Sequence, residues 1–189
     1  HAGGNAELKA ATGCTVVGPE EVGRIAPPDR VVTEGDVVEL GETRLRVIDT
    51  GGHTLGHITY HDAADGIAFV GDTLFALGCG RLFEGDAQQM WASLQRIAAL
   101  PEDTAVYCAH EYTASNARFA LSVDDSAALK TRAEQIFAAR ERGEPTVPTT
   151  IALERATNPF LRAPVLRPDI PDPAEAFGAV RAAKDGFKG

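Results

Sequence analysis

Short runs of β-branched and apolar residues, separated by glycine-containing turns, fill the first half of the chain and constrain its fold more than any other feature. Gly35-Asp36 and Gly41-Glu42 separate the early runs as the turns of β-hairpins would. The pattern predicts a sheet of short strands. These strands are expected over residues 31–32, 37–40, 43–48, 58–61, 67–70 and 105–108.

Apolar residues at helical spacing predict three helices, over residues 87–100, 129–140 and 174–184. Pro101 ends the first of them, and the other two lie in a second half that has no strand-like runs. The fold class is therefore predicted to be α/β. We expect two domains, a larger α/β domain over residues 1–112 and a smaller helical domain over residues 113–189.

Composition excludes several classes of partner. The formal net charge is −9 over 189 residues, which argues against binding to the phosphate backbone of nucleic acids. No apolar run approaches the roughly 20 residues that a membrane-spanning helix requires. We therefore expect neither a nucleic-acid partner nor a membrane partner. A small local basic site for an anionic metabolite remains compatible with the charge.

The cysteines indicate a reducing compartment. Cys14, Cys79 and Cys108 are odd in number, widely spaced and without a C-x-x-C pair. This pattern is typical of free thiols in a cytoplasmic protein rather than of a disulfide framework. We expect a cytoplasmic monomer.

Three potential metal ligands follow three predicted strands. His53, Asp72 and His110 each come directly after a strand or its terminal glycine turn. Side chains at the carboxyl ends of strands in α/β folds gather at one edge of the sheet, so these three can converge. Imidazole and carboxylate together suit zinc, iron or manganese, and a carboxylate can bridge two ions. From spacing alone, ordinary turn residues bonded to the backbone are an equally good interpretation.

Several longer strings, in order along the whole chain, closely resemble glyoxalase II of the metallo-β-lactamase superfamily. They are residues 71–75 (GDTLF), 78–85 (GCGRLFEG) and 110–113 (HEYT). The opening HAGGN resembles the end of the superfamily's H-x-H-x-D-H metal motif. Residues 158–162 (NPFLR) and 180–185 (VRAAKD) resemble the family's C-terminal helical domain.

The resemblance implies a metallo-β-lactamase αβ/βα sandwich, with its N-terminal part missing from this chain, followed by a small helical domain. It implies two divalent metal ions, with zinc favoured over iron or manganese. His53 would bind the first ion, His1 and His110 the second, and Asp72 would bridge both. The two histidines and the aspartate that precede the last histidine of the motif have no counterpart here, so we expect the natural protein to continue upstream.

The same resemblance implies hydrolysis of S-D-lactoylglutathione to D-lactate and glutathione, a step of methylglyoxal detoxification, with Asp72 acting beside a metal-bound hydroxide. Without the family, Arg181 and Lys184 would be interpreted as an ordinary solvated helix face. With it, four residues are expected to bind the glutathione moiety: Arg81, Tyr112, Arg181 and Lys184. Many members have lysine in place of Arg81, which keeps the charge and changes the donor geometry.

Two other functions remain open from the sequence. One is a persulfide dioxygenase of the same superfamily, which uses a single iron ion. The other is a non-catalytic, truncated relative that binds glutathione-like anions or a partner. Metal content and oxygen uptake distinguish the three.

The remaining histidines and cysteines are given structural roles. His57 is expected to support the site rather than bind metal, because glycines around it disfavour a helical pair with His53. His61 is expected to be a solvated surface residue. Cys79 and Cys108 flank the predicted site, but neither has a basic partner nearby in sequence, which favours packing over a nucleophilic role.

Overall fold

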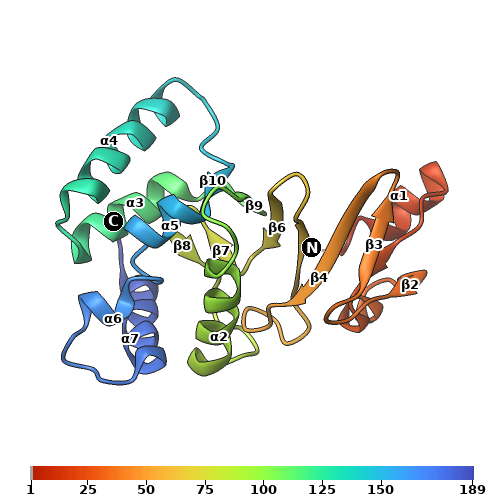
Figure 1. The fold of residues 1–189 in the computed structure, drawn as a ribbon, viewed down its shortest axis with the longest axis horizontal. Coiled ribbons are helices and arrows are strands. Elements are labelled where there is room, and N and C mark those ends of the chain that lie inside the picture. The colour runs from red at the N-terminus through yellow and green to blue at the C-terminus, as the bar shows by residue number, and fades with distance from the viewer. Residues whose placement is uncertain (1) are drawn as a thin grey trace.

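A six-stranded mixed sheet forms the centre of the computed structural model, which describes residues 2–189 (Figure 1). In pairing order its strands are β10 (Thr149–Thr150), β9 (Ala105–Cys108), β6 (Ile67–Gly71), β5 (Ile58–Asp62), β4 (Thr43–Asp49) and β3 (Val37–Leu40). The β6–β9 pair is parallel, and the other pairs are antiparallel. Strands β4, β6 and β9 therefore run in one direction, and their carboxyl ends lie at one edge of the sheet.

Two pairs of short strands and two short helices also lie in the first half of the chain. These are α1 (Asn5–Thr12), the parallel pair β1 (Val17–Gly18) and β2 (Arg30–Val31), the 3₁₀ helix η1 (Glu20–Arg24), and the antiparallel pair β7 (Leu74–Phe75) and β8 (Gly78–Cys79). Figure 1 shows α1 and β2 beside β3, at the end of the molecule away from the C-terminal helices. The β7–β8 pair lies among those helices instead.

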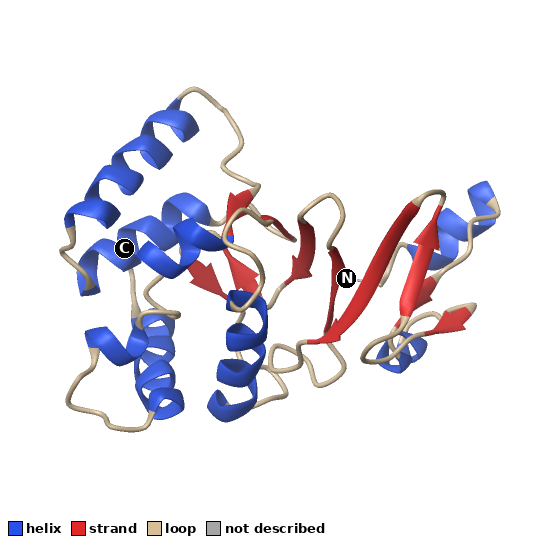
Figure 2. Cartoon of the chain, viewed as in Figure 1, coloured by secondary structure: helices blue, strands red, loops and turns tan. Residues whose placement is uncertain are grey.

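Six α-helices gather around the other end of the sheet, near β9 and β10 (Figure 2). They are α2 (Ala87–Ala98), α3 (Thr113–Val123), α4 (Ala127–Glu141), α5 (Ile151–Thr157), α6 (Ala163–Leu166) and α7 (Pro173–Gly186). Local sequence explains where two of them begin. The side chain of Asp86 accepts a hydrogen bond from Gln89 N at the start of α2, and Asp172 caps α7, whose first residue is Pro173.

The main core lies between the sheet and helices α2 and α7. Ala68, Val70 and Val106 on β6 and β9 pack with Met90 and Leu94 of α2, and all five are fully buried. Burial of each large side chain of this kind contributes roughly 1.5–3 kcal/mol relative to exposure. The core thus fixes the strands whose ends carry Asp72 and His110.

A second, smaller cluster joins α3 and α4 to the turn between β7 and β8. Its buried members are Leu77, Ala117, Ala120, Leu129, Ala133 and Ile136. The turn therefore packs against helices from the second half of the chain.

The structure confirms the α/β class and corrects two expectations. Strand β10 lies within the second half, for which only helices were predicted, because a two-residue segment pairs with the edge of β9. His61 was predicted to be solvated, which is wrong. It is 9% exposed, because it lies within β5 with Arg46 and Ala68 as its cross-strand neighbours.

The division into two domains at residue 112 stays a prediction. Among the helices of residues 2–189, none has the length and apolarity needed to cross a membrane.

Candidate active site

Three of the predicted ligands meet at the edge where β4, β6 and β9 end. His53 Nε2 lies 3.7 Å from Asp72 Oδ2, and His110 Nε2 lies 3.3 Å from Asp72 Oδ1. The two imidazoles therefore face different oxygens of a carboxylate that is only 3% exposed. The fourth predicted ligand, His1, lies outside the described residues.

The His53 ring is oriented by a backbone carbonyl. Its Nδ1 lies 2.8 Å from the carbonyl oxygen of Arg81, which can only accept a hydrogen bond. Nδ1 therefore carries a proton, and Nε2 is the ring nitrogen that faces Asp72. Metal-binding histidines in general are oriented by an outer hydrogen bond of this kind.

His57 holds the backbone of Asp72. The Asp72 N–H donates to His57 Nε2 at 3.0 Å, so the proton of the neutral ring lies on Nδ1. That nitrogen faces the hydroxyls of Thr50 and Thr73 at 3.1 and 3.0 Å. Burial lowers the pKa of His57, which favours the neutral ring that this arrangement requires. Its contacts agree with the expected structural role.

The donor set fits a site for divalent metal ions that shares one carboxylate. Imidazole nitrogen and carboxylate oxygen are common ligands of zinc and iron. Within residues 2–189, no three such groups surround a single point. The described residues therefore supply a pair of donors on each side of Asp72, one histidine nitrogen and one carboxylate oxygen.

A cavity of about 510 Å³ opens in front of these residues. Its wall comes from the loop after β8, from α3 and from α7. The charged residues along it are Asp72, Arg81, Arg181, Lys184 and Asp185. The wall thus carries three cations and two carboxylates, a local positive excess in a chain whose net charge is −9.

Arg81 and Tyr112, both predicted to bind substrate, lie at the open side of the cavity. The exposed guanidinium of Arg81 lies 3.8 Å from a carboxylate oxygen of Asp185, which is a weak contact. The Tyr112 ring stacks on His110 with a centroid separation of 4.7 Å and meets Phe75 edge-on. The Tyr112 side chain thus contacts a metal-ligand candidate, whereas Arg81 contacts His53 through its backbone carbonyl.

Arg181 and Lys184 lie on one face of α7, as predicted, and their environments differ. Arg181 is buried, donates to the carbonyl of Cys79 at 3.0 Å and to Asp185 at 2.8 Å, and has no partner at Nε. Lys184 is half-buried and donates to the carbonyl of Ser115. Burial, and then the neighbouring arginine charges, lower the pKa of Lys184.

Sequence reasoning missed Asp185, and it gave His57 a supporting role without identifying Asp72 as its partner. Asp185 stands four residues after Arg181, and that spacing alone predicts the ion pair on α7 that the structure shows. No local pattern pointed to the contact between His57 and Asp72, because it joins a loop to the end of a different strand.

Family models match nearly the whole chain. The metallo-beta-lactamase superfamily model matches residues 1–110, and the model described as hydroxyacylglutathione hydrolase C-terminus matches residues 111–187.

Two curated relatives and one solved structure agree with these matches. Proteins named hydroxyacylglutathione hydrolase from Erythrobacter litoralis and Maricaulis maris are 55% and 54% identical to the chain, which covers 76% of each of them. In both alignments 99% of the chain is matched. The crystal structure of ETHE1 from Myxococcus xanthus is 26% identical, with a TM-score of 0.59 over 97% of this chain and 72% of that one.

Replacement of Gly80 by alanine is expected to disturb the site directly. A Cβ there would lie 2.0 Å from the carbonyl oxygen of Asp72 and 3.0 Å from His53 Nδ1, so the backbone must shift. We expect Gly80→Ala to lower the free energy of unfolding by roughly 1–3 kcal/mol and to weaken zinc binding. Gly23→Ala is the control, because its Cβ would meet nothing within 4 Å. Thermal unfolding and zinc competition with a chromophoric chelator measure both effects, and equal results for the two variants would contradict the close approach at Gly80.

Cys79 is expected to stay unreactive in the folded protein. It is buried, and burial raises the pKa of its thiol to about 11. At pH 8 only about one such thiol in a thousand is ionised. Iodoacetamide should therefore modify the partly exposed Cys14 and leave Cys79 intact, as read by peptide mass mapping. Unfolded protein, in which all three cysteines react, is the control. Modification of Cys79 at the rate of Cys14 before unfolding would show that this thiol is accessible and ionised.

Proposed function

The chain belongs to the hydroxyacylglutathione hydrolase (glyoxalase II) family of the metallo-β-lactamase superfamily, and we propose that it hydrolyses S-D-lactoylglutathione to D-lactate and glutathione. The observation that carries the proposal is the position of Asp72. Its carboxylate lies between two histidines at the wall of a cavity that also holds three cations.

We propose two zinc ions as the resident metals. His53 and Asp72 would hold one, and Asp72 and His110 the other, with His1 as a further predicted ligand. When bound, divalent ions lower the pKa of a water molecule and polarise the thioester carbonyl. The orientation of His53 by Arg81 and of Asp72 by His57 keeps the donor atoms turned toward each other without further rearrangement.

The cations on the cavity wall suit a glutathione conjugate, which carries two carboxylates. Arg81 and Lys184 line this cavity, where a carboxylate could accept charge-assisted hydrogen bonds from them. Asp185 pairs closely with Arg181 and only weakly with Arg81, so it orients the Arg181 guanidinium and leaves that of Arg81 available to a ligand. Binding at these groups would place the thioester near Asp72.

The protonation of the two cysteines near the site favours water as the nucleophile. Burial raises the pKa of both cysteines near the site, Cys79 and Cys108, so neither is ionised at neutral pH. Direct attack by water needs no covalent enzyme intermediate. This supports metal-assisted hydrolysis over thiol catalysis for the thioester.

A combined assay of metal content, thioester cleavage and oxygen uptake tests the proposal. We expect the purified protein to cleave S-D-lactoylglutathione, to lose activity when a chelator removes metal, and to regain it with zinc. Glutathione persulfide should cause no oxygen uptake. Oxygen uptake with iron bound and no thioester cleavage would support the dioxygenase instead. A metal-free protein inert in both assays would support the non-catalytic alternative.

Loss of the Lys184 charge should weaken substrate binding more than turnover. A charge-assisted hydrogen bond contributes about 1.5 kcal/mol or more, so Lys184→Gln should raise KM for S-D-lactoylglutathione roughly tenfold. Lys130→Gln, which removes an exposed charge on α4 outside the cavity, is the control and should leave KM unchanged.

The same variant gives a pH test with a defined sign. Because the pKa of Lys184 is lowered, its positive charge is lost earlier than that of an ordinary lysine as pH rises. Substrate attraction is therefore present below that pKa and lost above it. Wild-type KM should rise in the alkaline range, and the variant should lack this part of the rise. Parallel pH profiles for the two proteins would exclude Lys184 from substrate binding.

A further inference from the structure

The turn between β7 and β8 has an unusual backbone. Leu77 has φ = +56°, the only positive φ at a non-glycine position within residues 2–189, and its side chain is fully buried. Residues with a branched side chain seldom adopt this region, so other contacts must stabilise it. One of them comes from α3, where Asn116 Nδ2 donates to the carbonyl of Ala76 at 3.1 Å.

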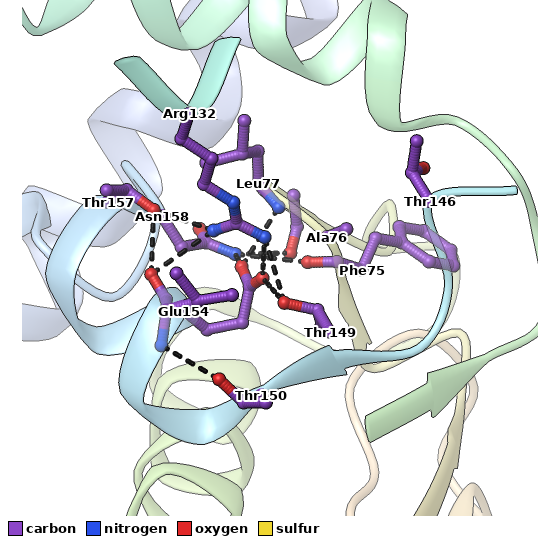
Figure 3. A network of polar contacts seen from close by, with 12 residues as sticks. Phe75, Ala76, Leu77, Arg132, Thr146, Thr149, Thr150, Glu154, Thr157 and Asn158 are labelled. Carbon is purple, nitrogen blue, oxygen red and sulfur yellow. Dashed lines mark hydrogen bonds and ion pairs between the residues drawn. The ribbon is translucent and has the colours of Figure 1, made fainter. Parts of the chain in front are cut away.

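Two side chains from α5 and the residue after it bind the rest of this turn (Figure 3). Glu154 Oε2 accepts the N–H of Leu77 at 2.9 Å. The side-chain amide of Asn158 donates to the carbonyls of Phe75 and Gly78, at 3.2 and 3.0 Å. Side chains distant in sequence therefore bind backbone groups on both sides of the turn and help to specify its shape.

Hydrogen-bond donors surround both carboxylate oxygens of Glu154 at this fully buried position, as a buried polar group requires. Oε1 accepts from Thr149 Oγ1 at 2.5 Å and from the guanidinium of Arg132, which forms an ion pair with it. Arg132 lies on α4 and is itself 8% exposed. Its second terminal nitrogen donates to Thr157 Oγ1 at 2.6 Å. Figure 3 shows Arg132, Thr149, Thr157 and Asn158 gathered around Glu154 below the turn.

The turn is the middle of the segment that builds the site. Asp72 stands just before β7, and Arg81, whose carbonyl orients His53, stands just after β8. The carbonyl of Cys79, at the end of β8, accepts from Arg181 on the cavity wall. A displacement of the turn would therefore move the bridging carboxylate, the orienting carbonyl and one wall of the cavity together.

We propose that Glu154, held by Arg132 and joined by Asn158, is a positioning residue of the hydrolytic site. It binds no substrate. It fixes the β7–β8 turn, and through that turn it fixes Asp72 and the carbonyl that orients His53. The effect of Glu154 on catalysis rests on the proposed function. Its effect on the position of the turn can be measured without an activity assay.

Glu154→Gln is the sharpest variant. It keeps the shape and removes one acceptor, so an NH₂ group must face either the Leu77 N–H or the Arg132 and Thr149 donors. Asp124→Asn is the matched control. Asp124 is also a buried carboxylate paired with an arginine, Arg162, at 3.1 Å, and it has no hydrogen bond to the turn.

Amide hydrogen exchange, zinc affinity and steady-state kinetics are measured on both variants and on the wild type. After correction for global stability, exchange across residues 73–81 should be about tenfold faster in Glu154→Gln and unchanged in the control. Zinc affinity should fall about tenfold in Glu154→Gln alone, as when a supporting group of a metal ligand is lost. The value of kcat should fall more than KM rises, because the displaced groups are those at the reacting centre.

If folded Glu154→Gln exchanges the amide hydrogens of residues 73–81 and binds zinc as the wild type does, the proposal is overturned. If that variant does not fold, Thr149→Val removes a single donor to Glu154 and should show smaller changes of the same kind. Behaviour like that of Asp124→Asn would then overturn it equally. If the wild type lacks thioesterase activity, the proposed function fails, and hydrogen exchange and zinc affinity still decide the role of Glu154.

Discussion

Strand pairing brings Asp72 to the edge of the sheet, and hydrogen bonds from outside the strand hold it there in a usable orientation. On one side its N–H donates to His57 Nε2. On the other side the chain turns at Leu77, whose N–H is bound by Glu154. A buried carboxylate is destabilising unless polar partners surround it. Asp72 therefore stays between the two histidines only if its backbone is held in position. The candidate site therefore depends on the hydrogen bonds that His57 and Glu154 make to the backbone at the two ends of the segment from Asp72 to Leu77.

The second half of the chain contributes to the site in two separate ways. Helix α7 supplies cations to the cavity wall, and α5 supplies the acceptor that shapes the turn below it. In a chain with a net charge of −9, anion attraction must come from such a local cluster. Asp185 reduces the net positive charge of this cluster by pairing with Arg181. The half-buried Lys184 forms no ion pair with a carboxylate among the contacts found in residues 2–189. The wall thus carries more cations than carboxylates without being uniformly positive.

Simple rules predicted the convergence of His53, Asp72 and His110, because the carboxyl ends of strands that run in one direction share an edge. The same rules failed where tertiary contacts decide. His61 stands at the expected strand end, yet the neighbouring strands bury it. Arg132 lies three residues after Leu129 on the apolar face of α4, and helical periodicity gives no reason for a charge there. Its partner Glu154 is distant in sequence, so the buried pair becomes visible only in three dimensions.

The composition of the β7–β8 turn explains why such a pair is needed. Two-residue turns between antiparallel strands usually rely on glycine or asparagine, which adopt positive φ at little cost. Ala76 and Leu77 have no such preference, so the local sequence does not specify this turn. An apolar side chain in place of Glu154 would leave the Leu77 N–H without its acceptor, and a neutral one would leave Arg132 without a countercharge. The Glu154 carboxylate accepts the Leu77 N–H and also pairs with Arg132. Because these two residues lie on α5 and α4, the packing of the two helices helps to hold the turn that follows Asp72.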